Sequence, residues 1–245
     1  REYKIDLQDD YHNPFINWKT FFHIREGTME QFLEDFWQLR LEAVKEQLEN
    51  NNFEVKIVQS ASEAAQHFLD TMLPHIRPAS VSYGGSMTLG STGLLDKLGD
   101  LENLELLSPN APGISVEEKL ELRRQGLLVD LYLTGTNAVT EDGCLVNLDM
   151  IGNRIAALTF GPKKVVVFVG RNKIVPDLES AMYRIKDYAA PANAMRLKCE
   201  TPCVKTSECA DCKSPGRICN TWTITEKSYP KERVTVVLIN EDLGL

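Results

Sequence analysis

Apolar residues fall into short runs along the chain, and amphipathic stretches separate those runs. Strand-like runs are found at residues 53–58, 79–83, 104–107, 127–133, 165–170 and 234–239. Most segments between them place apolar residues at helical spacing, and several begin with a Ser or Asp in the capping position. Strands that alternate with helices are typical of a parallel sheet with crossover helices. The pattern predicts an α/β fold, a Rossmann-like and mostly parallel sheet flanked by helices.

The amino-terminal part of the chain departs from this pattern. Residues 1–27 are polar and aromatic without a period, which predicts an arm that packs across the body or a partner subunit. A long amphipathic helix is expected over residues 28–50, and Thr28 and Gln31 match a capping box at its start. The arm and the helix together favour a homo-oligomer.

Three parts of the chain are therefore expected. Residues 1–50 form the arm and the first helix, and residues 51–196 together with 222–245 form the α/β domain. Residues 197–221 are polar, rich in Lys, Ser and Pro, and have no hydrophobic period. Such a segment cannot fold by apolar burial alone, so a bound metal is expected to order it.

Small polar residues gather where predicted strands end. The run at 127–133 leads into Gly135-Thr136-Asn137, and a Glu-Asp-Gly turn at 141–143 predicts a hairpin. The run at 79–83 leads into Gly84-Gly85-Ser86 before a helix, where free backbone N–H groups suit an anion but an ordinary turn is equally consistent. In open parallel sheets, ligands bind at the carboxyl ends of the strands. We expect the ligand site at this edge.

Charge and hydropathy narrow the classes of partner. The formal net charge of -8 disfavours nucleic acid, and a small anion would need a local basic or N–H-rich pocket. No apolar run approaches the roughly 20 residues that span a bilayer, and no signal peptide is recognisable in a chain that begins at Arg1. These features predict a cytoplasmic protein without a membrane span.

Five of the six cysteines are concentrated in the segment 197–221. In a reducing compartment such a cluster indicates metal rather than disulfides. Cys209 and Cys212 form a tight C-x2-C pair, and we expect Cys203 and Cys219 to complete the ligand set with Cys199 to spare. A [4Fe–4S] cluster is the favoured cofactor because only one such pair is present, with structural zinc or free thiols as alternatives.

Three blocks of the sequence resemble the LUD (lactate-utilisation) domain family. They are Tyr83-Gly-Gly-Ser-Met-Thr-Leu89, the block from Gly135 to Asn147, and the strand with its extension from Val165 to Val175. The resemblance covers residues 29–245 and is most specific in the central block. The family is similar in fold to sugar-phosphate isomerases, CoA transferases and the regulatory subunits of initiation factor 2B.

The resemblance implies a ligand site at the strand ends and a role in oxidising L-lactate to pyruvate with iron–sulfur partner proteins. The residues it assigns to the ligand are Gly84, Gly85, Ser86, Gly135, Thr136, Asn137 and Asn147, to which we add Tyr83 and Arg171 as neighbours of these loops. Asn137 and Glu141 are the catalytic candidates. Related isomerases carry an acidic residue where Asn137 stands, and Glu141 is the nearby match to the glutamate nucleophile of CoA transferases.

Two other functions remain open on these residues. A non-catalytic ligand sensor or assembly subunit with structural zinc fits the lack of an acid–base pair in the central block. A sugar-phosphate isomerase-like or CoA transferase-like enzyme fits the resemblance in fold. The favoured hypothesis is a LUD-type protein that binds a small anionic carboxylate or phosphate and carries an iron–sulfur cluster. Its expected role is in lactate or hydroxy-acid oxidation, as an oxidoreductase component, or in related electron transfer.

Overall fold

A computed structural model describes the backbone of residues 18–245 and the side chains from residue 31 onward. The chain divides into residues 1–39 and a compact unit formed by residues 40–245. Helix α1 (Trp18–Asn50) extends across this division. The expectation that this helix begins at Thr28 was wrong, because the helical hydrogen-bond pattern continues back to Trp18. Much of the predicted arm lies outside the described residues.

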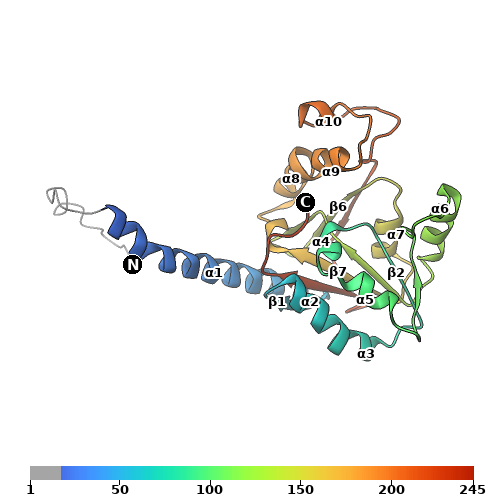
Figure 1. The fold of residues 1–245 in the computed structure, drawn as a ribbon, viewed down its shortest axis with the longest axis horizontal. Coiled ribbons are helices and arrows are strands. Elements are labelled where there is room, and N and C mark those ends of the chain that lie inside the picture. Colours follow the sequence, from blue (N-terminus) through green and yellow to red (C-terminus); the bar gives the residue numbers. More distant parts are fainter. Residues whose placement is uncertain (1–17) are drawn as a thin grey trace. The chain divides into compact units, whose positions relative to one another are not determined.

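The compact unit is built on a six-stranded sheet in which all paired strands are parallel (Figure 1). The order is β1 (Glu54–Val58), β10 (Val234–Ile239), β7 (Lys164–Gly170), β4 (Leu131–Gly135), β2 (Ser80–Tyr83) and β3 (Glu105–Leu107). Each predicted strand is present, β10 with the predicted ends and the other five with shifted ends. The expected α/β class with a parallel sheet is confirmed.

The helical segments that follow α1 are mostly short. They are α2 (Ala61–His67), the π-helix η1 (Phe68–Met72), α3 (Leu73–Ile76), α4 (Met87–Ser91), α5 (Leu94–Gly99), α6 (Val116–Gln125), α7 (Asn153–Thr159), the 3-10 helix η2 (Arg171–Lys173), α8 (Leu178–Arg184), the π-helix η3 (Ile185–Ala189), α9 (Ala190–Arg196) and α10 (Cys203–Thr206). The caps expected from sequence form at α2, α6 and α8, where Ser60, Ser115 and Asp177 each accept a backbone N–H.

Two apolar layers cover the two faces of the parallel sheet. Along β7, Val165, Val167 and Val169 pack on one face, while Val166 and Phe168 pack on the other. This alternation is the period of a strand buried on both sides. The first layer includes the α1 residues Leu41, Val44 and Leu48, and the second includes residues of α2, α4 and α5. The last part of α1, residues 40–50, is thus part of the core of the compact unit.

A second sheet of four strands lies beside the first layer. Its order is β8 (Ile174–Val175), β5 (Ala138–Thr140), β6 (Leu145–Asp149) and β9 (Thr221–Thr225). The predicted hairpin across the Glu-Asp-Gly turn is confirmed, since β5 and β6 pair antiparallel. β8 and β9 were not expected, because β8 has only two residues and β9 pairs with a strand far away in the sequence.

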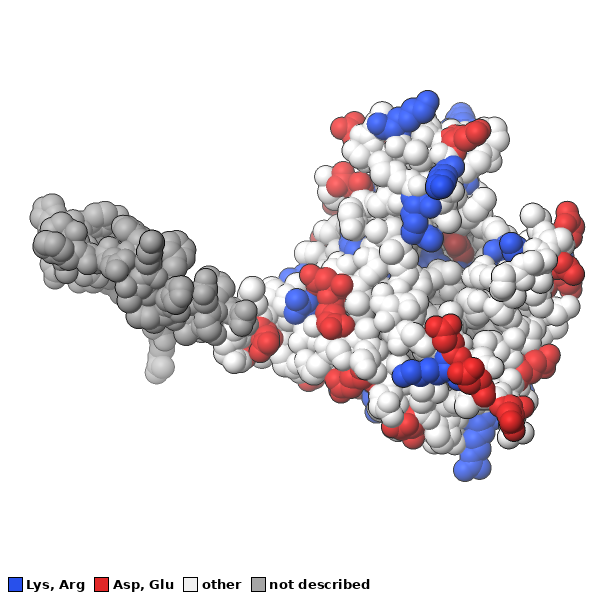
Figure 2. All heavy atoms as spheres, viewed as in Figure 1, with Lys and Arg blue, Asp and Glu red and all other residues white. Residues whose placement is uncertain are grey.

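Charged side chains of both signs lie on the surface of the compact unit. Figure 2 shows Lys and Arg side chains, with Asp and Glu side chains among them, over the end that carries α9, α10 and the cysteine-bearing loop (residues 197–221). This loop contributes Lys198, Lys205, Lys213 and Arg217 together with Glu200, Glu208 and Asp211. Among the helices described from residue 18 onward, none has both the length and the apolar character needed to cross a bilayer.

Candidate anion-binding site

Three neighbouring strands of the parallel sheet, β2, β4 and β7, lead at their carboxyl ends into a cavity of about 630 Å³. That size is typical of small-molecule sites, and the location is the one expected for an open parallel sheet. The sequence-predicted residues that line it are Tyr83, Gly84, Gly85 and Ser86 after β2, and Gly135, Thr136 and Asn137 after β4. The structure therefore brings together seven candidates from two separate loops.

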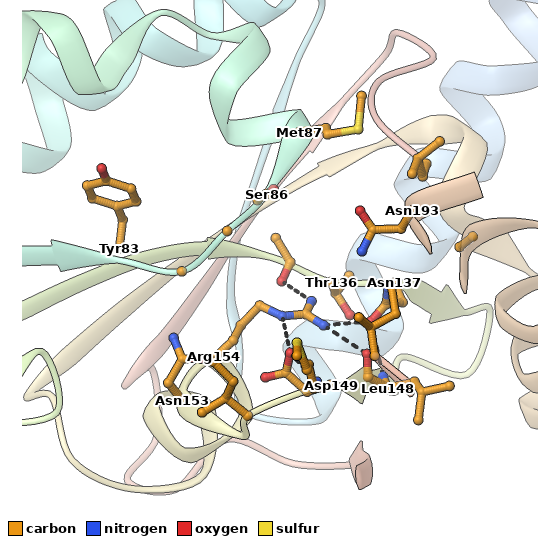
Figure 3. A pocket seen from close by; sticks show the side chains of 18 of the residues that line it. Tyr83, Ser86, Met87, Thr136, Asn137, Leu148, Asp149, Asn153, Arg154 and Asn193 are labelled. Atoms are coloured by element: carbon orange, nitrogen blue, oxygen red, sulfur yellow. Dashed lines mark hydrogen bonds and ion pairs between the residues drawn. The ribbon is translucent and has the colours of Figure 1, made fainter. Parts of the chain in front are cut away.

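Arg154, on α7, organises one wall of this cavity (Figure 3). The residue is 8% exposed, and its two terminal nitrogens donate four hydrogen bonds inside the protein. The acceptors are the carbonyl oxygens of Gly135 (3.2 Å) and Leu148 (3.4 Å) and the Oδ1 atoms of Asn137 (2.7 Å) and Asn147 (2.9 Å). Its Nε lies 3.8 Å from the Asp149 carboxylate. Arg154 thus ties the end of β4 to the hairpin β5–β6.

Two of the glycines at the cavity have little space for a side chain. A Cβ atom on Gly84 would lie 3.1 Å from the Arg154 Cγ and 3.0 Å from the Tyr132 hydroxyl. A Cβ atom on Gly135 would collide with the Ser86 hydroxyl, which caps α4. The absence of side chains at these two positions allows the β2 and β4 loops to approach each other at the cavity.

Lys173 is the least solvated charged group at the cavity. It lines the cavity after β7 and is only 4% exposed, and its Nζ donates one hydrogen bond, to the Thr136 carbonyl at 3.1 Å. Within residues 31–245 no carboxylate forms an ion pair with it. Burial, with added repulsion from Arg184 and Arg154, lowers the pKa of Lys173 from 10.5 to about 7. Because a charged lysine has three N–H donors and Nζ uses one of them in the described residues, the amine can donate further hydrogen bonds to a ligand.

The charges around the cavity are mostly positive. Arg123, Arg154, Lys173 and Arg196 line it, whereas Asp149 is the acidic residue among the lining side chains described. Asp149 is already engaged, because its carboxylate accepts from the backbone N–H groups of Met150 (3.2 Å) and Ile155 (3.4 Å) and lies beside Arg154. In a chain with a net charge of -8, this pocket is a local site of positive potential.

Three of the predicted site residues lie outside the cavity lining. Asn147 is fully buried behind it and accepts hydrogen bonds from Arg154, Thr136 and the Asn137 backbone. Arg171 points to the other side of the η2 turn, where its Nε lies 2.9 Å from the Asp242 carboxylate. Glu141 pairs with Arg40 at 2.7 Å, on the hairpin turn.

Sequence reasoning missed Arg154 and Lys173. Arg154 is the one charged residue in the otherwise apolar stretch 154–158, a signal that it is held inside. Arg171 and Lys173 both follow β7 in the sequence, and the prediction named Arg171. The two side chains have different partners because they lie at the two ends of the 3-10 helix η2, which a periodic pattern cannot predict at this length.

The cysteine-bearing loop forms a second, much smaller cavity of about 20 Å³. Cys203, Cys209, Cys212 and Cys219 line it together, whereas Cys199 does not. All of the chain's cysteines are free thiols. Within the described part of the chain, no group of three or more His, Cys, Asp or Glu side chains is arranged to hold a metal ion. Ile218 lines both cavities, so the two lie next to each other.

Comparison with known proteins places the chain in a family. The model of the LUD domain matches residues 41–239. No curated protein matches the chain. Among solved structures, a DUF162 family protein from Deinococcus radiodurans is 15% identical with a TM-score of 0.48, over 83% of this chain and 98% of that one. Ribose 5-phosphate isomerase from Plasmodium falciparum is 13% identical with a TM-score of 0.25, over 57% of this chain and 54% of that one.

These two structural likenesses are too weak to carry an argument about function. The match to the family model, in contrast, covers almost the whole of the compact unit. This protein belongs to the LUD domain family.

Proposed function

We propose that the cavity at the ends of β2, β4 and β7 binds a small organic anion, with Lys173 as its direct partner. The observation that carries the proposal is a buried amine without a counter-ion, at the wall of a cavity large enough for a small molecule. A buried charge is costly unless it is paired, so the missing partner is expected to be an anionic ligand.

Arg154 has a different role in this proposal. All four N–H groups on its terminal nitrogens are already used within the protein, so it shapes the pocket and adds positive potential rather than contacting the ligand. Arg123 and Arg196 add further positive charge at the lining. The LUD family is associated with lactate utilisation, which favours a carboxylate such as L-lactate or pyruvate over a phosphate.

A binding role fits the site better than proton-transfer or acyl-transfer chemistry. Asp149 is engaged with Arg154 and the start of α7, and Glu141 is paired with Arg40 away from the cavity lining. A general base or a carboxylate nucleophile must reach the reacting atom. The alternatives of an isomerase-like or CoA transferase-like enzyme have no free carboxylate among the described lining residues.

The test is a thermal-shift panel with L-lactate, pyruvate and inorganic phosphate, each matched in ionic strength with NaCl. A bound ligand stabilises the fold by about 2.7 kcal/mol at a hundredfold excess over its Kd. We expect the carboxylates to raise the unfolding midpoint of the native chain and to have no such effect on Lys173→Met. If no anion exceeds its NaCl control, the proposal fails.

A second candidate function concerns the cysteine-bearing loop. We propose that Cys203, Cys209, Cys212 and Cys219 hold a metal centre, because four thiols from one short loop line the same cavity. The donor set suits iron–sulfur or zinc chemistry. The cavity has room for about one water-sized group, so a four-iron cluster would require the loop to widen, whereas a single zinc ion requires a smaller adjustment.

An iron–sulfur cluster bound here would supply one-electron transfer beside the ligand cavity, while zinc would only order the loop. Metal and acid-labile sulfide analysis of anaerobically purified protein separates the two. Iron with equimolar sulfide, lost in Cys209→Ser/Cys212→Ser, supports the redox role in lactate utilisation. Zinc without sulfide supports the non-catalytic alternative, and absence of both metals refutes a metal centre.

A further inference from the structure

Four exposed apolar residues line the anion cavity, next to the exposed Asn110 and Arg196. The four are Met87, Met150, Ile151 and Leu197, and each is between 43% and 49% exposed. They come from the start of α4, from the loop after β6 and from the end of α9. Large apolar side chains from three separate segments therefore converge, half-solvated, on one opening. Exposed apolar surface of this kind marks a place where something is bound.

The two most buried cations of the lining and the four apolar residues differ in their exposure to solvent. Lys173 and Arg154 are almost completely buried, whereas the four apolar residues are at the solvent boundary. Figure 3 shows Met87 well separated from the Arg154 guanidinium and its hydrogen-bond partners. A ligand that places its charged group next to Lys173 would therefore pass its remaining atoms between apolar side chains.

The volume of the cavity also exceeds the needs of a three-carbon acid. Lactate has six non-hydrogen atoms, and at roughly 10–15 Å³ of such cavity volume for each water-sized group they would fill less than a sixth of the space. The cavity itself is about 630 Å³. A longer substituent would fill more of it and would cover the exposed apolar surface at the mouth.

We propose that the preferred ligand is an anion with an apolar tail, of the class of 2-hydroxy or 2-oxo carboxylates with chains longer than that of lactate. This inference rests on the proposed function, since it takes the carboxylate to be held near Lys173. It adds that Met87, Met150, Ile151 and Leu197 determine specificity by contacting the chain of the ligand.

The experiment is a calorimetric titration of the native protein with L-lactate, 2-hydroxybutyrate and 2-hydroxyhexanoate at one pH and ionic strength. Burial of a methylene group increases affinity by up to about fourfold, and partial burial at a half-open mouth reduces this to roughly twofold. We expect each added methylene to tighten binding by two- to fourfold. The same series is measured on Met150→Ser/Ile151→Ser, in which the gain per methylene should shrink toward onefold.

Leu128→Ser is the matched control, because Leu128 is 86% exposed and does not line the cavity. It should keep the full chain-length dependence. Urea unfolding of each variant verifies that it folds, and a single Met150→Ser substitution replaces the double variant if that one does not.

The outcomes separate the two proposals. If none of the three acids binds, the apolar-tail inference is overturned, and the proposed function is refuted as well if no anion of the thermal-shift panel exceeds its NaCl control. If all bind with equal affinity, or if the double variant keeps the full gain per methylene, the anion site remains and the apolar-tail inference is overturned. If, in addition, the serine substitutions convert an oligomer into a monomer in sedimentation, these apolar residues form a protein contact and not a ligand contact.

Discussion

Replacement of Arg154 by methionine tests whether this side chain holds the site together. Methionine keeps much of the volume of the side chain but removes the guanidinium that connects the end of β4 with the hairpin β5–β6. Four hydrogen bonds are lost, two to backbone carbonyls and two to the buried or half-buried amides of Asn147 and Asn137. The weak ion pair with Asp149 is lost as well.

The magnitude follows from the burial of these groups. An acceptor left unsatisfied in the interior costs about 1–3 kcal/mol, and breaking a buried charged network costs about 3–5 kcal/mol in total. We expect Arg154→Met to lower the free energy of unfolding by about 3–5 kcal/mol. For a domain of this size, about 2–4 °C per kcal/mol gives a loss of roughly 6–20 °C in Tm.

Urea unfolding followed by circular dichroism measures this loss. Arg196→Met is the control for removing one arginine from the cavity, because Arg196 is exposed and its hydrogen-bond partner among residues 31–245 is Asn193, within its own helix. Its loss should be within about 0.5 kcal/mol. Arg154→Lys keeps the charge but not the planar fork, so it should recover only part of the stability. If Arg154→Met is no less stable than Arg196→Met, the role given to Arg154 is refuted.

Three further predictions concern Lys173 and the hairpin turn. The pKa of Lys173 is lowered to about 7 in the folded chain, and a bound anion favours the charged form of the amine. Anion affinity should therefore fall as pH rises above about 7. Calorimetry from pH 6 to pH 9 should show this fall in the native chain and no such fall in Lys173→Arg. Without ligand, Lys173 binds more protons in the unfolded chain than in the folded chain between pH 7 and pH 10.5. The free energy of unfolding, measured by urea titration, should therefore rise across that pH window. An equal rise in Lys173→Met would contradict the burial of this amine. Gly143→Ala should lower the free energy of unfolding by about 1–3 kcal/mol. At this position φ is +84°, and a Cβ atom would lie 2.8 Å from the Gln47 carbonyl carbon. Gly99→Ala is the control and should be near neutral in the same assay, because a Cβ atom on Gly99 would have open space around it.

The parallel sheet could be predicted because each strand carries its signal locally. The run of valines in β7 is buried on both faces and reads as an uninterrupted apolar stretch. The second sheet could not be predicted in full, because β9 is stabilised by pairing with β6, about 75 residues earlier in the chain. The start of α1 was also misplaced, since a capping-box pattern inside a helix is indistinguishable in sequence from one at its beginning.

The location of the cavity could be predicted, but not all of the side chains that line it. The rule that ligands bind at the carboxyl ends of parallel strands directed the prediction to the loops after β2 and β4, and both loops line the cavity. The cations were missed because their roles depend on tertiary burial. Arg154 reaches the cavity from a helix that packs behind it, and Lys173 is distinguished from Arg171 only by the direction of a single 3-10 turn.

The most direct measurement of the central claim is the Kd of pyruvate for the native chain, for Lys173→Met and for Lys163→Met. Lys163 pairs with Asp130 on the surface, so its replacement removes the same charge away from the cavity. A charge-assisted hydrogen bond contributes about 1.5–3 kcal/mol, which corresponds to roughly 10- to 150-fold in affinity. We expect Lys173→Met to weaken binding by that factor and Lys163→Met to leave it within about twofold. Equal affinities in all three proteins would contradict an anion site at Lys173.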